Sequence, residues 1–168
     1  MSDALRPRGP LWTLYEHLAM HLGLGALALL CLTWLPFAML LHPLLPRPVG
    51  QRLGRRVIAA GFRFYLGLLE RLCACRFDLS EIEGLRTERG LVIAANHPSL
   101  LDAVILVSQL PDAICVMKAS LMDNPLFGSA ARLARYVRND GILQIIAGGC
   151  EAVQQGSHLV LFPEGSRT

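Results

Sequence analysis

The stretch LVIAANHPSLLD, residues 91–102, decides the fold class of this chain. Its first five residues are apolar and rich in strand formers, and the apolar residues from Leu100 to Leu110 are too dense and too many for a turn. A short polar island, NHPSLLD at Asn96 to Asp102, begins where the first run ends. The pattern predicts a strand followed by a helix, with His97 at the junction.

A histidine at such a junction can present one ring nitrogen to a cleft. Asp102, about one helical turn further on, can accept a hydrogen bond from the other ring nitrogen. This pair would remove a proton from a hydroxyl group without a serine or cysteine nucleophile. An alternative stays open, because Ser99 followed by Asp102 is also a capping-box pattern that could simply start the helix after Pro98.

A second polar island, FPEGSRT at residues 162–168, follows another apolar strand-like run. The H-x-x-x-x-D arrangement of His97 and Asp102, followed by F-P-E-G-S-R, resembles the signature of the glycerolipid acyltransferases, which include the lysophosphatidic acid acyltransferases. The residues between the islands agree: ICVMKASL at 114–121 and NPLFG at 124–128 are similar to the family's strand, basic residue and proline-glycine helix. The resemblance covers residues 50–168.

The resemblance implies an α/β fold, a layered domain with a mixed sheet flanked by helices. It implies transfer of a fatty acyl chain from an acyl thioester to the hydroxyl of a lysolipid, with His97 as general base and Asp102 orienting it. The acceptor expected from the family is 1-acyl-glycerol-3-phosphate, which gives phosphatidic acid. Acyl-CoA or acyl-ACP (acyl carrier protein) would be the co-substrate, and neither a cofactor nor a metal is expected.

Basic side chains near the motifs could bind the phosphate of such an acceptor. Lys118, Arg138 and Arg167 are the candidates, since a guanidinium gives a phosphate two hydrogen bonds. Arg138 is the best match to the family's second motif and Arg135 the next. Glu164, Gly165 and Ser166 would shape the turn or bind acceptor hydroxyls. Alternatively, the basic residues are solvated surface charges and Pro163 to Ser166 is a β-turn.

Two departures from the family pattern keep other functions open. Pro98 and Leu100 stand where many members that form phosphatidic acid carry other residue types, which allows a non-phosphate acceptor such as an aminolipid or a polyene lipid. The chain also stops directly after F-P-E-G-S-R, which corresponds to the family's third motif, whereas family members continue. We therefore expect a catalytic domain at residues 49–168 that is incomplete at its C-terminus, and an inactive membrane-anchored binding protein is a third hypothesis.

The N-terminal part is strongly apolar. Of the 168 residues, 53% are hydrophobic, and Leu22 to Leu41 contains no charge. That run is long enough to cross a bilayer, so residues 1–48 are interpreted as a membrane anchor. Pro36 and the prolines at 43, 46 and 48 would bend or end the helix, which leaves a re-entrant hairpin as an alternative. Four arginines, at positions 47, 52, 55 and 56, favour a cytoplasmic catalytic domain at the inner membrane.

Gln51 to Leu72 is predicted to be a second helix, whose arginines either contact anionic lipid or are solvated while its apolar face packs on the domain. The net charge of +3 and the absence of a known motif argue against a nucleic-acid partner. The five cysteines fit no zinc pattern and indicate a reducing compartment. Strands are expected at 75–79, 91–95, 113–117, 135–137 and 158–162, helices at 99–110, 121–134 and 141–155, and a polar hairpin-like connection at 81–90.

Overall fold

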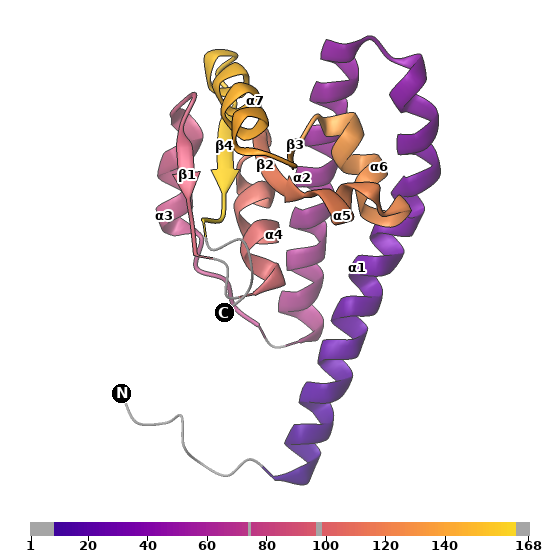
Figure 1. Ribbon diagram of the computed structural model, residues 1–168. Helices are drawn as coiled ribbons and strands as arrows, with labels where there is room; N and C mark the ends of the chain where they lie inside the picture. The colour runs from indigo at the N-terminus through magenta and orange to yellow at the C-terminus, as the bar shows by residue number, and fades with distance from the viewer. Residues whose placement is uncertain (1–8, 74, 97–98, 164–168) are drawn as a thin grey trace.

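The computed structural model describes residues 9–73, 75–96 and 99–163. Two long N-terminal helices stand beside an α/β domain, and the domain's sheet lies between helices (Figure 1). The helices are α1 (Pro10–Leu44), α2 (Arg47–Leu72), α3 (Ser80–Glu83), the 3-10 turn η1 (Gly84–Thr87), α4 (Leu100–Gln109), α5 (Ala119–Asp123), α6 (Pro125–Ala134) and α7 (Ile142–Gln154). The strands are β1 (Val92–Ala94), β2 (Ala113–Lys118), β3 (Val137–Asn139) and β4 (His158–Leu161).

The sheet has the order β1-β4-β2-β3, and all its pairings are parallel. The fold class is confirmed as α/β, although the four described strands form a parallel sheet rather than the mixed one expected. Parallel strands need crossover connections, and here each connection contains a helix. Because of these crossovers, the amino ends of the four described strands lie along one side of the sheet and their carboxyl ends along the opposite side. We call these two sides the amino edge and the carboxyl edge.

Side chains alternate between the two faces of the sheet and build two apolar cores. On one face, Ala113 and Cys115 of β2 pack with Val107 of α4 and Val160 of β4. On the other face, Ile114 and Leu159 pack with residues of β3 and α7. A third cluster joins α1, α2 and α4 through Leu27, Leu66, Leu69 and Val104. The N-terminal helices are therefore packed onto the domain through α4, and they also contact α6.

The strands predicted at 91–95, 113–117 and 158–162 are confirmed, the one at 135–137 lies two residues later because Arg135 has a left-handed backbone, and the one at 75–79 is wrong. Asp78 accepts hydrogen bonds from the backbone nitrogen (3.2 Å) and hydroxyl (2.6 Å) of Ser80, so the chain turns into α3 there. The connection at 81–90 consequently contains helical turns instead of a hairpin. The helix predicted at 121–134 is divided into α5 and α6, because Asn124 adopts the extended backbone (ψ 128°) that a following proline imposes.

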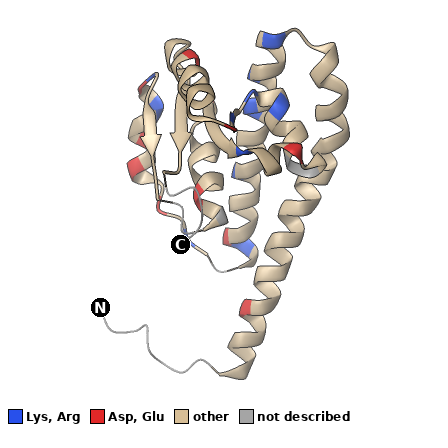
Figure 2. Ribbon diagram, viewed as in Figure 1, with Lys and Arg blue, Asp and Glu red and all other residues tan. Residues whose placement is uncertain are grey.

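The helix α1 is longer than the predicted segment Leu22–Leu41 and contains both Pro36 and Pro43. By length and composition it could cross a membrane, and only 11% of its most apolar stretch is buried in the structure. Glu16 is its one acidic residue, and it carries no lysine or arginine (Figure 2). Near its beginning, the Tyr15 hydroxyl donates to the carbonyl of Leu72 (3.1 Å), so α1 and α2 form an antiparallel hairpin.

Candidate functional site

The two polar islands follow strands that lie next to each other. β1 and β4 are hydrogen-bonded neighbours, with Ala94 opposite Leu161, and the backbone nitrogen of Ala95 donates to the Leu161 carbonyl (3.1 Å). The chain therefore leaves both strands at the same edge of the sheet, at Asn96 and at Phe162. In parallel α/β sheets, the carboxyl ends of the strands are the usual location of ligand sites. Within the described residues, the topology thus joins two segments that lie far apart in sequence.

Asp102 lies in the first turn of α4, at this same edge. Ser99 is the N-cap of the helix: its hydroxyl accepts from the backbone nitrogen of Leu101 (3.2 Å), and its own backbone nitrogen donates to Oδ2 of Asp102 (2.7 Å). The Ser99 hydroxyl also donates to Oδ1 of Asp102 (3.3 Å). The capping-box alternative is therefore confirmed. The cap is compatible with the hypothesis that Asp102 orients His97, because each carboxylate oxygen can accept more than one hydrogen bond.

His97 lies outside the described residues, as do Pro98 and the third-motif residues Glu164, Gly165, Ser166 and Arg167. Their roles stay predictions. The structure places the strand ends from which these residues follow, and it places Asp102.

Lys118 and Arg138 lie at the carboxyl ends of the other two strands. Lys118 is the exposed last residue of β2 and pairs in register with Asn139 of β3. Arg138 donates through Nη1 and Nη2 to the two carboxylate oxygens of Asp123 (2.5 and 3.0 Å), and through Nε to Asp140. These hydrogen bonds raise the pKa of Arg138 and lower the pKa of Asp123. Arg138 thus forms ion pairs with two carboxylates, whereas Lys118 is exposed at the carboxyl end of β2.

Arg135, the alternative match to the second motif, lies on the corner between α6 and β3. It is exposed and has a left-handed backbone (φ 58°), and it ends α6 by donating its backbone nitrogen to the Arg132 carbonyl (3.2 Å). Arg135 precedes β3 and Arg138 lies within it, so the two arginines are at different points along the strand. Of the two, only Arg138 is at the carboxyl edge.

The sequence-based interpretation of α2 needs a correction at Arg55. This residue was expected on a lipid-facing or solvated surface, but it is only 5% exposed and reaches into the domain. Its Nε donates to the Ala134 carbonyl (3.1 Å), and its Nη1 donates to the Ser157 hydroxyl (2.7 Å). A signal was present in the sequence, because Arg55 precedes the buried residues Ala59, Leu66 and Leu69 at helical spacing.

Comparison with known proteins shows the family of the chain. A family model for acyltransferases matches residues 76–168, from the segment after α2 to the end of the chain, and so includes both polar islands. The chain belongs to the acyltransferase family. Members of this family that resemble it are named for a glycerolipid reaction.

The chain is 32% identical over 107 residues to the 1-acyl-sn-glycerol-3-phosphate acyltransferase of Helicobacter pylori strain J99, covering 58% of this chain and 45% of the relative. It is 25% identical over 140 residues to the enzyme of the same name from Pseudomonas aeruginosa, covering 80% of this chain and 53% of the relative. This acyltransferase-family chain thus spans about half the length of the curated relatives it matches. No solved structure matches it.

Proposed function

We propose that the protein transfers a fatty acyl chain from an acyl thioester to the hydroxyl of a lysolipid, with 1-acyl-glycerol-3-phosphate as acceptor and phosphatidic acid as product. One observation carries the proposal. The segments that lead to His97 and Glu164 follow the carboxyl ends of two neighbouring strands, β1 and β4, and Asp102 lies in the first turn of α4 at the same edge. Membership of the acyltransferase family and the names of its relatives support the same reaction class.

In the proposed mechanism, His97 takes the proton of the acceptor hydroxyl as the oxygen attacks the thioester carbonyl carbon. Asp102 holds the imidazole in the required tautomer and stabilises the imidazolium. The C–S bond then breaks, and the sulfur leaves as a thiol after taking the proton back from His97. The acyl chain passes directly to the acceptor oxygen, so no acyl-enzyme forms.

The donor and the setting are part of the same proposal. Acyl-CoA or acyl-ACP would present its thioester from the cytosol, while the acyl chain and the lysolipid come from the bilayer. The apolar surface of α1 supports this arrangement, since it would hold the domain beside a membrane. We place the protein at the inner membrane with its catalytic domain in the cytoplasm, because the arginines that begin α2 follow the apolar helix.

A second acceptor class is favoured by one observation. Arg138 is bound by Asp123 and Asp140, so a phosphate would have to compete with two carboxylates for its guanidinium. Lys118, which is exposed, and Arg167 would then be the phosphate ligands. If neither serves, the acceptor is a lysolipid without a phosphate monoester, such as an aminolipid. Preference between lysophosphatidic acid and its dephosphorylated counterpart, monoacylglycerol, separates the two candidates.

The test is transfer of a labelled acyl chain from CoA or ACP to lysophosphatidic acid in membranes that contain the chain. His97→Ala should abolish the product, and His21→Ala, which removes an exposed imidazole on α1, should leave it unchanged. An active His97→Ala variant would overturn the mechanism. Product from monoacylglycerol alone would replace the phosphate acceptor with the second class. Absence of product from every acceptor, with the chain folded, would favour the binding protein.

A further inference from the structure

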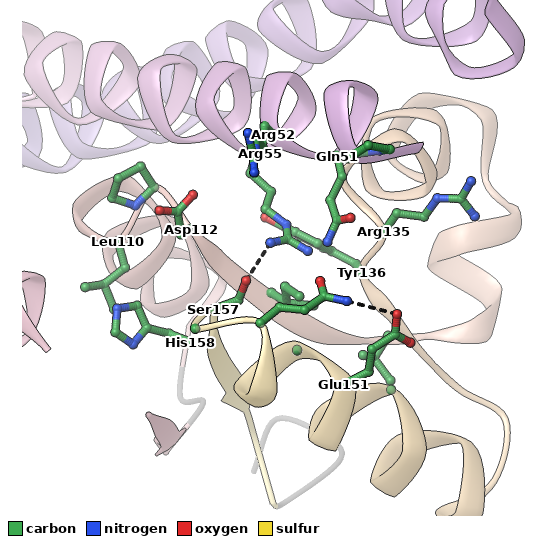
Figure 3. A pocket seen from close by; sticks show the side chains of 18 of the residues that line it. Gln51, Arg52, Arg55, Leu110, Asp112, Arg135, Tyr136, Glu151, Ser157 and His158 are labelled. Atoms are coloured by element: carbon green, nitrogen blue, oxygen red, sulfur yellow. Dashed lines mark hydrogen bonds between the residues drawn. The ribbon is translucent and has the colours of Figure 1, made fainter. Parts of the chain in front are cut away.

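A large polar cavity lies away from the two motifs, between α2, α7 and the amino ends of the central strands. Its volume is about 1190 Å³. Its walls include Pro111 and Asp112 before β2, Tyr136 before β3, and Ser157 and His158 at the start of β4 (Figure 3). Because the strands are parallel, this position is at the opposite end of β4 from the third motif. The proposed acyl transfer does not use these residues.

The cavity has an excess of positive charge. Seven arginines and four carboxylates line it. Arg138 is already neutralised by Asp140, one of the four, and by Asp123 outside the cavity. In the part of the chain that the structure describes, Arg52 and Arg135 form neither a hydrogen bond nor an ion pair with another side chain. Among the described residues the same holds for Arg47 and Arg89, so several arginines from separate elements are available to an anion.

Buried polar groups in one wall point to the same kind of ligand. The Arg55 guanidinium is 5% exposed, and its two hydrogen-bond partners, the Ala134 carbonyl and the Ser157 hydroxyl, are neutral. Its Nη2, the Tyr136 hydroxyl and Nδ1 of His158 are buried and have no hydrogen-bond partner. A buried cation that hydrogen-bonds only neutral groups and a buried donor without an acceptor both cost free energy. An anion in the adjoining cavity would offset this cost.

The chemistry of the wall selects the kind of anion. Burial raises the pKa of Tyr136 well above its ordinary value, so its hydroxyl keeps its proton and can donate. Asp112 lies near Arg55 and His158 in the same wall and offsets part of the positive charge (Figure 3). A dianion with several acceptor oxygens matches the remaining excess better than a single carboxylate, because planar guanidinium groups bind phosphate oxygens in pairs.

We propose that this cavity binds a phosphate monoester, with Arg52 and Arg135 as charged ligands at its mouth and the Arg55 guanidinium supplying buried positive charge behind them. Arg52, Arg55 and Arg135 lie away from the proposed catalytic edge, although Arg138 at that edge also lines the cavity, and the proposal does not depend on the acyl-transfer proposal. The same headgroup chemistry occurs in a soluble phosphate ester and in phosphatidic acid at a membrane surface. The experiment therefore offers both forms.

Binding is measured by isothermal titration calorimetry on the full chain in a nonionic detergent, with inorganic phosphate as the soluble probe. In a parallel titration, micelles doped with phosphatidic acid are compared with micelles doped with phosphatidylcholine. The test variant is Arg52→Gln/Arg135→Gln, in which both side chains are exposed, so folding should be retained. The matched control is Arg56→Gln, an exposed arginine of α2 that does not line the cavity.

We expect saturable binding that is about tenfold or more weaker in the double variant, since two charged ligands are lost, and unchanged in Arg56→Gln. Binding of inorganic phosphate identifies a soluble ligand, and binding of phosphatidic acid micelles alone identifies a lipid headgroup. Absence of binding in both titrations overturns the proposal. Equal affinities of the double variant and Arg56→Gln, with both folded by circular dichroism, overturn it as well.

Discussion

Asp102 is part of the helix cap of α4 and, in the proposed mechanism, the carboxylate that orients His97; two substitutions separate these roles. Ser99→Ala removes the cap hydroxyl, which accepts from the Leu101 nitrogen (3.2 Å). Loss of such a cap costs about 1 kcal/mol. Asp102→Asn keeps an oxygen that can accept from the Ser99 nitrogen but loses the negative charge at the helix N-terminus, a change of about 0.3–1 kcal/mol.

The two variants should therefore lose similar stability, a decrease in Tm of roughly 1–4 °C for a chain of this size. Their activities should differ widely. In the proposed mechanism, Asp102→Asn removes the anionic partner of His97, and we expect kcat to fall by about 10²–10⁴. Ser99→Ala leaves the carboxylate in place and should stay within a few-fold of the unmodified chain.

The assay is acyl transfer at saturating substrate, measured well below the Tm of each variant, with thermal unfolding in the same detergent as the stability control. Full activity of Asp102→Asn would show that Asp102 is only a helix cap. An equal loss of kcat in both variants would show that the ordered start of α4, and not the charge of Asp102, supports the reaction.

Three further predictions concern packing and titration. Gly54→Ala should destabilise the chain, because the new Cβ would lie 2.9 Å from the Ala134 nitrogen of α6. Overpacking of about 1–3 kcal/mol outweighs the gain in helix propensity of up to about 1 kcal/mol. Gly67→Ala should raise the Tm, because no atom lies within 4 Å of its added Cβ. Equal Tm shifts of the two variants in thermal unfolding would contradict this difference. Burial lowers the pKa of His158, against a smaller opposing effect of Asp112, so the unfolded chain binds a proton that the folded chain does not. Stability should then fall as the pH drops below about 6.5, and His158→Gln should flatten this dependence in denaturant titrations; an unchanged slope would refute it. Because Arg138 lowers the pKa of Asp123, Arg138→Gln should move that pKa up toward its ordinary value in an NMR titration, and an unmoved pKa would show that the ion pair is absent.

The sequence predicted the α/β elements well wherever local pattern and tertiary environment agree. The run Ala113–Met117 is apolar throughout, as a strand buried on both faces must be, and it forms β2. Ser99 and Asp102 carry the capping signal in their spacing, and the helix begins there. In both cases the residues that specify the element are the ones that it uses.

Other features depend on contacts that a linear pattern does not contain. The run Cys75–Leu79 looks like a strand, but Asp78 captures Ser80 and turns the chain. Arg55 looks like a surface charge, yet Ser157 and the Ala134 carbonyl, about 100 and 79 positions further along, accept its hydrogen bonds. The pairing of Arg138 with Asp123 is equally nonlocal. The nonlocal partners of Arg55 and Arg138 can be identified only from the folded structure, in which the distant segments lie together.

The parallel sheet also explains how one small domain could hold both proposed sites. Every strand begins at one edge and ends at the other, so residues that precede strands gather at the first edge and residues that follow strands gather at the second. Asn96 and Phe162 follow β1 and β4, whereas Tyr136 and Ser157 precede β3 and β4. Substitution of Arg52 and Arg135 should therefore leave acyl transfer intact unless the cavity's ligand acts through β4, which joins the two edges, or through Arg138, which lines the cavity and lies at the carboxyl edge. A loss of acyl transfer in Arg52→Gln/Arg135→Gln, with Arg56→Gln unaffected, would demonstrate that coupling.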